Sequence, residues 1–271
     1  MQKSPNFWKI ISLQNQSGES MRTKIIAGNW KMYKTIAEAL ELVKALHYGC
    51  QCNAIEVIVS PPVTALPKVA EFLKDSYIKV AAQDLFWEDF GAYTGALSAP
   101  LLKDAGAEYV IIGHSERRQY FGETNETVNK KIKAALKHAL IPIICIGETL
   151  DEREAGQVGE VLATQIASGL AGLTETEIAD SVVAYEPVWA IGTGKTASPA
   201  QAEETHVIIR QLIAKQFGND AANKLRILYG GSVKPSNSKE LLSLENIDGA
   251  LVGGASLNAK DFMEIIENSS G

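Results

Sequence analysis

The feature that most constrains the fold is a regular alternation of short apolar runs with longer stretches of helical spacing, from Thr23 onward. Each run is about as long as a β-strand, and most are apolar at consecutive positions, as expected where helices cover both faces of a parallel sheet. We therefore predict eight strands, at Lys24–Ala27, Ile55–Val59, Ile78–Ala82, Tyr109–Ile112, Pro142–Ile146, Val182–Tyr185, Arg226–Tyr229 and Gly249–Val252.

The stretches between these runs indicate amphipathic helices, because their apolar residues recur every three or four positions. The clearest sets are Ile36, Ala39, Leu40, Val43 and Leu46; Val128, Ile132, Leu136 and Ala139; and Ile208, Leu212 and Ile213. The second set predicts a solvated face that carries Lys130, Lys131, Lys133 and Lys137. Helix starts are marked by capping boxes, at Ser198 with Pro199 and Gln201, and at Thr149 with Glu152.

The chain reads as one α/β domain over residues 21–271, since no Pro-, Gly- or Ser-rich linker and no repeat divides it. Eight strand–helix units in roughly 250 residues is the number found in a closed (β/α)8 barrel. An open, doubly wound sheet has the same alternation, so the pattern favours the barrel without excluding the open sheet.

Residues 1–20 differ from the rest, because their few apolar residues lie among Gln, Asn and Ser without a clear period. They contain neither the uninterrupted apolar stretch of a secretory signal nor the arginines of a transit peptide. Met21 is a second possible start. We expect residues 1–20 to be a non-catalytic extension.

The charge balance limits the possible partners. The 271 residues include 26 basic and 32 acidic side chains, a net charge of -6, whereas a nucleic-acid surface needs basic residues to neutralise phosphates. We expect no nucleic-acid partner, and an anionic ligand would have to be met by local groups. The 46% hydrophobic content suits a globular protein with a large core.

The cysteine content and the hydropathy of the chain indicate in which cellular compartment we expect the protein. Cys50, Cys52 and Cys145 cannot all pair, and Cys50 with Cys52 lacks the second ligand pair of a structural zinc site. No apolar run approaches the roughly 20 residues that span a bilayer. We expect a cytoplasmic protein that is not embedded in a membrane.

Polar residues are concentrated just after the predicted strands, where a barrel carries its chemistry. Asn29 and Lys31 follow the first strand, His114, Ser115 and Glu116 the fourth, and Glu186 the sixth. These side chains can meet only if the fold brings the strand ends together.

Glycine pairs follow the seventh and eighth strands, at Gly230–Gly231 and Gly253–Gly254. Glycines let backbone N–H groups approach a ligand closely, and a phosphate dianion is the usual ligand of such donors. Gly192 and Gly194 could add another donor. No dinucleotide fingerprint and no P-loop occurs, so we expect no nucleotide cofactor.

Glu186, His114 and Lys31 together can catalyse an enolisation. A carboxylate can take a proton from carbon next to a carbonyl, an imidazole can exchange protons with the oxygens, and an ammonium can stabilise an enediolate. Each residue alone has an ordinary structural explanation. The four histidines form no metal-binding pattern, so we expect no metal.

Five segments carry a resemblance to a known family. They are AGNWKM at 27–32, IGHSERR at 112–118, YEPVWAIGTGK at 185–195, YGGSV at 229–233 and VGGASL at 252–257. In the order and content of these segments the chain, from about Arg22 to Ile266, resembles the triosephosphate isomerase family. The resemblance implies a TIM barrel that interconverts dihydroxyacetone phosphate and D-glyceraldehyde 3-phosphate through an enediolate, in glycolysis and gluconeogenesis, without cofactor or metal.

The resemblance also implies roles for individual residues. Glu186 is similar to the family's base, His114 to its neutral electrophile, Lys31 to the cation on the substrate, and Asn29 to a further hydrogen-bond donor. The implied backbone donors to phosphate are Gly192, Ser232, Gly253 and Gly254. Ser115 and Glu116 match supporting positions, as does Cys145, although Cys145 is equally well explained as a small core residue. Pro187 to Lys195 is similar to the family's closing lid.

A homodimer is implied as well. Gln83, Tyr93, Thr94 and Gly95 match the loop that the family inserts into a neighbouring subunit. The family usually has a Glu where this chain has Ala96, a residue expected to support the dimer through an arginine such as Arg117. We therefore expect a weaker interface with an intact catalytic set.

Two other functions remain open at the level of sequence. One is another phosphate-binding barrel, such as a phosphoribosyl isomerase, against which the segment 185–195 argues. The other is a non-enzymatic binding protein on the same scaffold, whose signature would be loss of Glu186, His114 or Lys31; none is lost.

Overall fold

The computed structural model describes residues 22–50, 54–191 and 196–270, and in it eight parallel strands close into a barrel in the order of the chain. The strands are β1 Ile25–Asn29, β2 Glu56–Ser60, β3 Lys79–Ala82, β4 Tyr109–Ile112, β5 Ile141–Ile146, β6 Val182–Tyr185, β7 Arg226–Tyr229 and β8 Gly249–Val252. Closure comes from pairing of β1 with β8, which begins at Ile25 opposite Gly249. The barrel prediction is confirmed, and the open sheet is excluded. The predicted extension, 1–20, lies outside the described residues.

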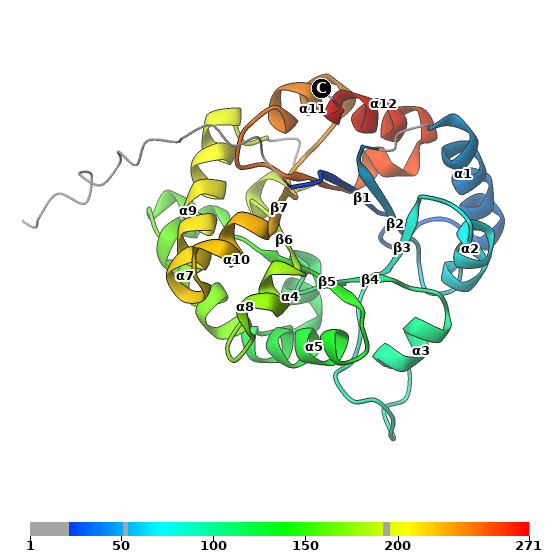
Figure 1. Ribbon diagram of the computed structural model, residues 1–271, viewed down its shortest axis with the longest axis horizontal. Helices are drawn as coiled ribbons and strands as arrows, with labels where there is room; N and C mark the ends of the chain where they lie inside the picture. Colours follow the sequence, from blue (N-terminus) through cyan, green and yellow to red (C-terminus); the bar gives the residue numbers. More distant parts are fainter. Residues whose placement is uncertain (1–21, 51–53, 192–195, 271) are drawn as a thin grey trace, which may run out of the picture.

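Helices surround the barrel as an outer layer (Figure 1). They are α1 Ile36–Gly49, α2 Leu66–Leu73, α3 Ala99–Asp104, α4 Ser115–Phe121, α5 Asn125–Lys137, α6 Leu150–Glu154, α7 Val158–Gly169, α8 Glu175–Ala179, α9 Pro199–Phe217, α10 Asn219–Lys224, α11 Pro235–Leu242 and α12 Ala259–Ser269, with short 3-10 helices η1 Val188–Ala190 and η2 Gly254–Leu257. Both predicted capping boxes are confirmed, because Ser198 and Thr149 each accept a hydrogen bond from the backbone three residues on. Among the described segments, no helix is both long and apolar enough to cross a membrane.

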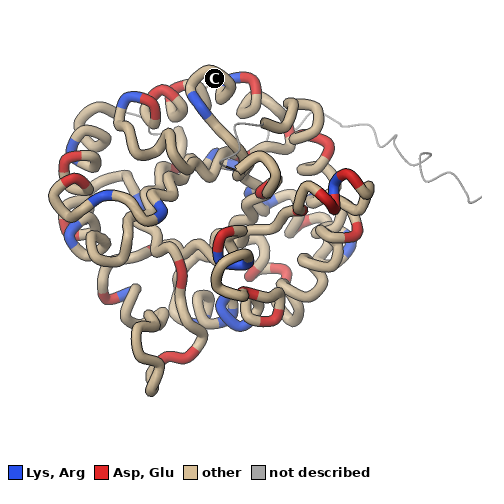
Figure 2. The backbone as a smooth tube through the Cα atoms, turned by 180° about the vertical axis from the view of Figure 1, so that it is seen from behind, with Lys and Arg blue, Asp and Glu red and all other residues tan. Residues whose placement is uncertain are grey.

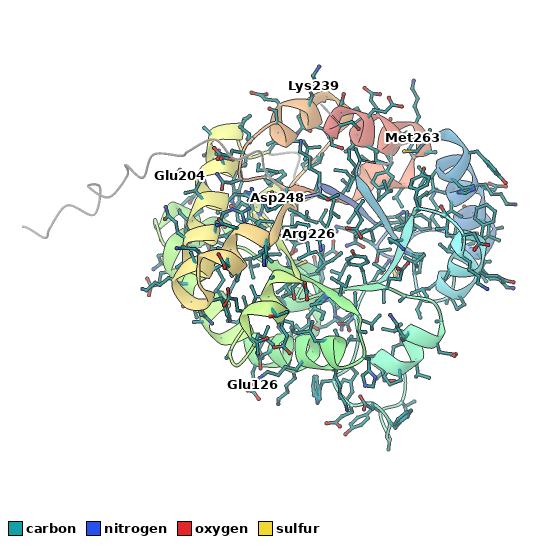
Figure 3. All side chains as sticks on the ribbon, in the orientation of Figure 1. Glu126, Glu204, Arg226, Lys239, Asp248 and Met263 are labelled. Carbon is teal, nitrogen blue, oxygen red and sulfur yellow. The ribbon has the colours of Figure 1, made fainter. Side chains whose placement is uncertain are left out.

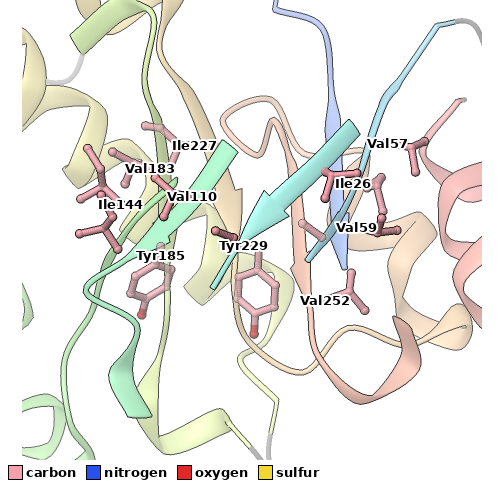
Figure 4. Close-up of a cluster of buried hydrophobic side chains, with 14 of the residues drawn as sticks. Ile26, Val57, Val59, Val110, Ile144, Val183, Tyr185, Ile227, Tyr229 and Val252 are labelled. Atoms are coloured by element: carbon pink, nitrogen blue, oxygen red, sulfur yellow. The ribbon is translucent and has the colours of Figure 1, made fainter. Parts of the chain in front are cut away.

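Alternation along each strand divides the core into two layers. The side chains of one parity, such as Ile25, Ala27 and Cys145, form a cluster inside the barrel. Those of the other parity pack against the helices, among them Ile26, Val57, Val59, Val110, Ile144, Val183, Tyr185, Ile227, Tyr229 and Val252 (Figure 4). Successive side chains of a strand point alternately into and out of the barrel. A residue two positions beyond the last inward-facing residue of a strand therefore also points inward, at the mouth of the barrel.

Positions occupied by Lys or Arg and by Asp or Glu are interspersed along the backbone of the outer ring in Figure 2. Arg226 and Asp248, labelled in Figure 3, lie where β7 and β8 begin, at the amino-terminal end of the barrel. There Arg210 Nη2 lies 2.7 Å from Asp248 Oδ2, and Arg226 Nη1 lies 2.8 Å from Glu56 Oε2. These pairs belong to the end opposite the predicted site.

The lysine-rich face of α5 differs from its prediction at one position. Lys130, Lys133 and Lys137 are exposed as expected, but Lys131 is buried, with 4% of its surface accessible. Its ammonium pairs with Glu123 and lies 2.5 Å from Asp84 Oδ1. The prediction for Lys131 was wrong because both carboxylates come from other segments, which the periodicity of one helix does not reveal.

Candidate active site

A pocket of about 330 Å³ at the carboxyl ends of the strands brings the predicted residues together. Asn29 and Lys31 come from the end of β1, His114 from β4 and Glu186 from β6. Ser232 follows β7, and Gly253 and Gly254 follow β8; all three line the same pocket. Gly192, the remaining predicted phosphate donor, lies outside the described residues.

Glu186 reaches the pocket because it continues the inward parity of Val182 and Ala184. It is 2% exposed, and its Oε2 accepts a hydrogen bond of 2.8 Å from the Ser115 N–H. Burial alone would raise the pKa of Glu186, but the charge and contact of His114 and the Ser115 N–H outweigh it and lower the pKa. The carboxylate is therefore held ionised and able to accept a proton.

His114 is placed by a left-handed turn at Gly113, whose φ is 75°, and it caps the amino terminus of α4. Its Nδ1 accepts a hydrogen bond of 3.3 Å from the Glu116 N–H, so the proton of the neutral ring lies on Nε2. Nε2 lies 2.9 Å from Glu186 Oε1. Burial lowers the pKa of His114, while ionised Glu186 and then Glu116 act more strongly and raise it. This increase depends on Glu186 staying beside the ring.

Lys31 has an unusual backbone, with φ of 52°, a region that a lysine rarely adopts. Its N–H donates to Asn29 Oδ1 over 3.0 Å, and its carbonyl accepts from Gln83 Nε2 over 2.8 Å. Its Nζ lies 2.5 Å from Glu116 Oε1. Surrounding contacts thus impose a strained conformation at the site. The contact of Gln83 with its own chain was not apparent from sequence.

The glycine-rich strand ends line the pocket beside Glu186 and Lys31. Gly254 starts η2, and the first N–H groups of a helix have no partner within it. A Cβ at Gly230 would lie 2.9 Å from Glu186 Cγ, and one at Gly231 would lie 2.3 Å from the Tyr229 hydroxyl, so both positions need glycine. Lys234 also lines the pocket. The sequence pattern did not single out Lys234, although it lies shortly after the Gly230–Gly231 pair.

The first residues of the predicted lid pack on a buried carboxylate. Trp189 in η1 donates from Nε1 to Glu148 Oε1 over 2.9 Å, and Arg153 lies 2.9 Å from the same oxygen with its guanidinium 5.1 Å from the Trp189 ring centre. The Val188 N–H donates to the Glu148 carbonyl. The signal that could have identified Glu148 was its place just beyond β5, after Gly147. Predicted lid residues 192–195 lie outside the described residues.

Cys145 lies inside the barrel, fully buried among the inward residues. Burial, and then the negative charge of Glu186, raises the pKa of its thiol well above the ordinary value. The thiol is therefore kept protonated. This placement agrees with the interpretation of Cys145 as a small core residue.

The closed barrel gathers a carboxylate, an imidazole, a lysine and glycine-rich strand ends in one pocket, a set of groups typical of enzymes that transfer protons on an anionic substrate. Comparisons with known proteins narrow this class. The family model described as triosephosphate isomerase matches residues 24–269.

Individual relatives agree with the family match. The triosephosphate isomerase of Citrifermentans bemidjiense is 58% identical over 250 residues, covering 92% of this chain and all of the relative. That of Moorella thermoacetica is 56% identical over 246 residues, 91% of this chain and 98% of the relative. The crystal structure of triosephosphate isomerase from Bartonella henselae superposes with a TM-score of 0.84 at 41% identity, over 92% of this chain and all of that chain.

The chain belongs to the triosephosphate isomerase family. It is an isomerase, and its activity is the interconversion of dihydroxyacetone phosphate and glyceraldehyde 3-phosphate in glycolysis.

Proposed function

We propose that Glu186, His114 and Lys31 carry out this isomerisation by the following route. The Glu186 carboxylate takes a proton from C1 of dihydroxyacetone phosphate, a C1–C2 double bond forms, and the carbonyl electrons move to the C2 oxygen. The resulting enediolate gains a proton at that oxygen and loses one from the C1 oxygen through His114. Glu186 then returns its proton to C2. Atoms and charge balance without a further reactant.

The geometry of the free site supports these roles. Since His114 Nδ1 accepts the Glu116 N–H, the Nε2–H is the group that faces the pocket and can polarise a carbonyl as a neutral donor. The increase in the pKa of His114 comes mainly from Glu186 and then from Glu116, so the pKa decreases when Glu186 turns to the substrate carbon. Lys31 adds the positive charge that an enediolate and a phosphate both need.

We further propose that the phosphate is held by backbone N–H groups of Gly192, Ser232, Gly253 and Gly254. Three of these residues line the pocket on the side of β7 and β8. This is where barrels commonly bind phosphate. Closure of the lid that begins at Pro187 would then exclude water from the intermediate.

The single observation that carries the proposal is that Glu186 is buried and lies 2.9 Å from His114 Nε2 in the pocket that Lys31 also lines. The test is a coupled assay with glyceraldehyde 3-phosphate, comparing Glu186→Gln with wild type. We expect kcat to fall by roughly 10² to 10⁴, because the base is lost while size is kept. Glu160→Gln, on the exposed face of α7, is the matched control and should leave kcat unchanged. Near-normal turnover of Glu186→Gln would refute the assignment.

A homodimer is also part of the proposal, with the Thr94 loop of one copy beside the site of the other. A second pocket, of about 410 Å³, adjoins the first and is lined by Lys31, Gln83 and Glu116. Met32, which also lines this second pocket, is 94% exposed, and Tyr93, next to Thr94 in the predicted dimer loop, is 46% exposed. Apolar side chains presented in this way favour burial against another copy.

We propose that the dimer is weakened, because this chain has Ala96 where the family usually has a Glu that supports the interface. Arg117 Nη2 lies 2.9 Å from Asp84 Oδ2, and its Nε lies 3.2 Å from Glu123 Oε1, so its partners are carboxylates of its own chain. Sedimentation velocity over falling concentration tests this. The Ala96→Glu variant should remain dimeric at lower protein concentrations than the wild type does. If the wild type remains dimeric to concentrations as low as the variant does, the proposed weakening is refuted.

For location and domain organisation we propose a cytoplasmic enzyme whose residues 1–20 are not catalytic. Three cysteines without a complete pairing scheme support a reducing compartment. Deletion of residues 1–20 should leave kcat and the sedimentation coefficient of the dimer, corrected for mass, unchanged. A large decrease in either would show that the segment belongs to the working enzyme.

A further inference from the structure

The turn that places His114 is held from both sides by charged side chains. The backbone of Gly113 is left-handed, with φ of 75°, and a Cβ there would lie 2.9 Å from Val128 Cγ2. Both features require glycine at this position. The Gly113 N–H donates to Glu123 Oε2 over 3.1 Å. Its carbonyl accepts from Arg118 Nε over 2.8 Å. Both peptide groups that flank the glycine are therefore fixed by side chains.

Arg118 connects this turn to two other elements. Its Nη1 donates to Asn125 Oδ1 at the start of α5 over 2.7 Å, and its Nη2 donates to the Cys145 carbonyl of β5 over 3.4 Å. All three partners of the guanidinium are neutral oxygen atoms, from backbone or amide groups. Because a guanidinium is planar and its donors have fixed directions, these bonds set the relative positions of β4, β5 and α5 at the mouth of the barrel.

The orientation of two site residues depends on this arrangement. The Gly113 carbonyl and the His114 N–H belong to one peptide plane, so a rotation there carries the imidazole with it. Ser115 follows directly, and its N–H holds Glu186 Oε2. A change at Gly113 would therefore move the electrophile and the resting position of the base together, while the glycines after β7 and β8 stay in place.

We propose that Arg118 is a positioning residue for the isomerisation, acting through the Gly113 carbonyl on His114 and Ser115. The inference rests on the function proposed above, in which His114 polarises the substrate carbonyl. Arg118 itself need not touch the substrate.

The test is Arg118→Lys, which keeps the charge but cannot donate to all three oxygens at once. Since a misplacement of about 1 Å can cost up to 10²-fold in rate, we expect kcat to fall roughly tenfold while KM changes less than about twofold. The ¹⁵N shifts of the His114 ring should move, because the geometry at Nδ1 and Nε2 changes. A variant with lower melting temperature but unchanged kcat and unchanged ring shifts would overturn the inference and leave Arg118 a purely structural residue.

A second variant keeps the inference testable if Arg118→Lys does not fold. Asn125→Ala removes one bond of the guanidinium and leaves the Gly113 bond available. It should lower kcat by a smaller factor in the same direction and shift the same ring signals. Unchanged kcat and signals in this variant would then overturn the inference.

His114→Gln separates failure of this inference from failure of the proposed function. If His114→Gln lowers kcat strongly and Arg118→Lys does not, only the role of Arg118 is wrong. If His114→Gln retains wild-type kcat, the proposed role of His114 fails, and the inference fails with it.

Discussion

Gly230→Ala should displace the proposed base without altering its chemistry. The added Cβ would lie 2.9 Å from Glu186 Cγ and 3.0 Å from the Tyr185 carbonyl oxygen. The backbone on this side cannot yield easily, because the Gly230 N–H donates to that same carbonyl over 2.7 Å. The Glu186 side chain is the softer of the two obstacles, so its carboxylate should move away from Ser115 and His114.

The size of the effect follows from these distances. Two carbon atoms in contact prefer about 3.5 to 4.0 Å, so Cγ must shift by roughly 0.6 Å or more, and the carboxylate at the end of the side chain by a comparable distance. Such a misplacement should lower kcat by about 10- to 100-fold. KM should change little, because the Lys31 and Gly254 side of the pocket is not touched. Overpacking should also lower the free energy of unfolding by about 1–3 kcal/mol.

The assay is steady-state isomerisation in both directions, with urea unfolding of the same samples. Gly159→Ala is the matched control, because its Cβ would meet nothing within 4 Å and it lies in the first turn of α7. That variant should keep kcat and be unchanged or slightly more stable. If Gly230→Ala retains kcat within twofold of wild type, the reasoning that Gly230 makes room for Glu186 is wrong.

Two further predictions concern stability. Lys131→Met removes one of the two cations that pair with Glu123 and Asp84, while Arg117 remains as the other, so it should lower the free energy of unfolding by about 1.5–3 kcal/mol, measured by urea denaturation. The exposed Lys133→Met should change it by less than about 0.5 kcal/mol, and equal midpoints for the two variants would contradict this. His206 is fully buried, and burial lowers its pKa from 6.5 to about 4, so the folded protein binds this proton more weakly than the unfolded chain does. The stability that neutral His206 provides is therefore complete above pH 6.5 and is lost as the pH falls towards 4. His206→Phe should remove about 3 kcal/mol of the pH dependence of unfolding between pH 7 and 4, and an unchanged dependence would refute the assignment.

Much of the fold could be predicted because its signals are local. Eight apolar runs, their lengths and their flanking glycines come from neighbouring residues, and the strands at Tyr109–Ile112, Val182–Tyr185, Arg226–Tyr229 and Gly249–Val252 have the predicted bounds. The strand of the first run ends two residues later than expected, at Asn29. Closure could not be predicted from the pattern, because it depends on pairing between β1 and β8, at opposite ends of the chain.

The residues of the candidate site could also be predicted from local sequence signals, but their contacts with distant segments could not. Polar residues after strands stand out in the sequence, so Glu186, His114 and Lys31 could be named. The contacts that Gln83 and Arg118 make within their own chain could not be predicted, because Gln83 donates to the distant Lys31 carbonyl and Arg118 to the distant Cys145 carbonyl. Nearly every residue type has the same backbone carbonyl, so the amino-acid sequence does not show which carbonyl accepts such a hydrogen bond.

The sequence by itself thus determined the strand and helix pattern, the residues available for chemistry at the strand ends, and the glycines where an anion can approach. The tertiary structure alone decided that β1 meets β8, that Lys131 is buried between two carboxylates, and that Lys31 holds a left-handed backbone. The first group depends on residues within a few positions of one another. The second depends on contacts between segments far apart in the chain, where burial and charge are set by the neighbour rather than by the residue itself.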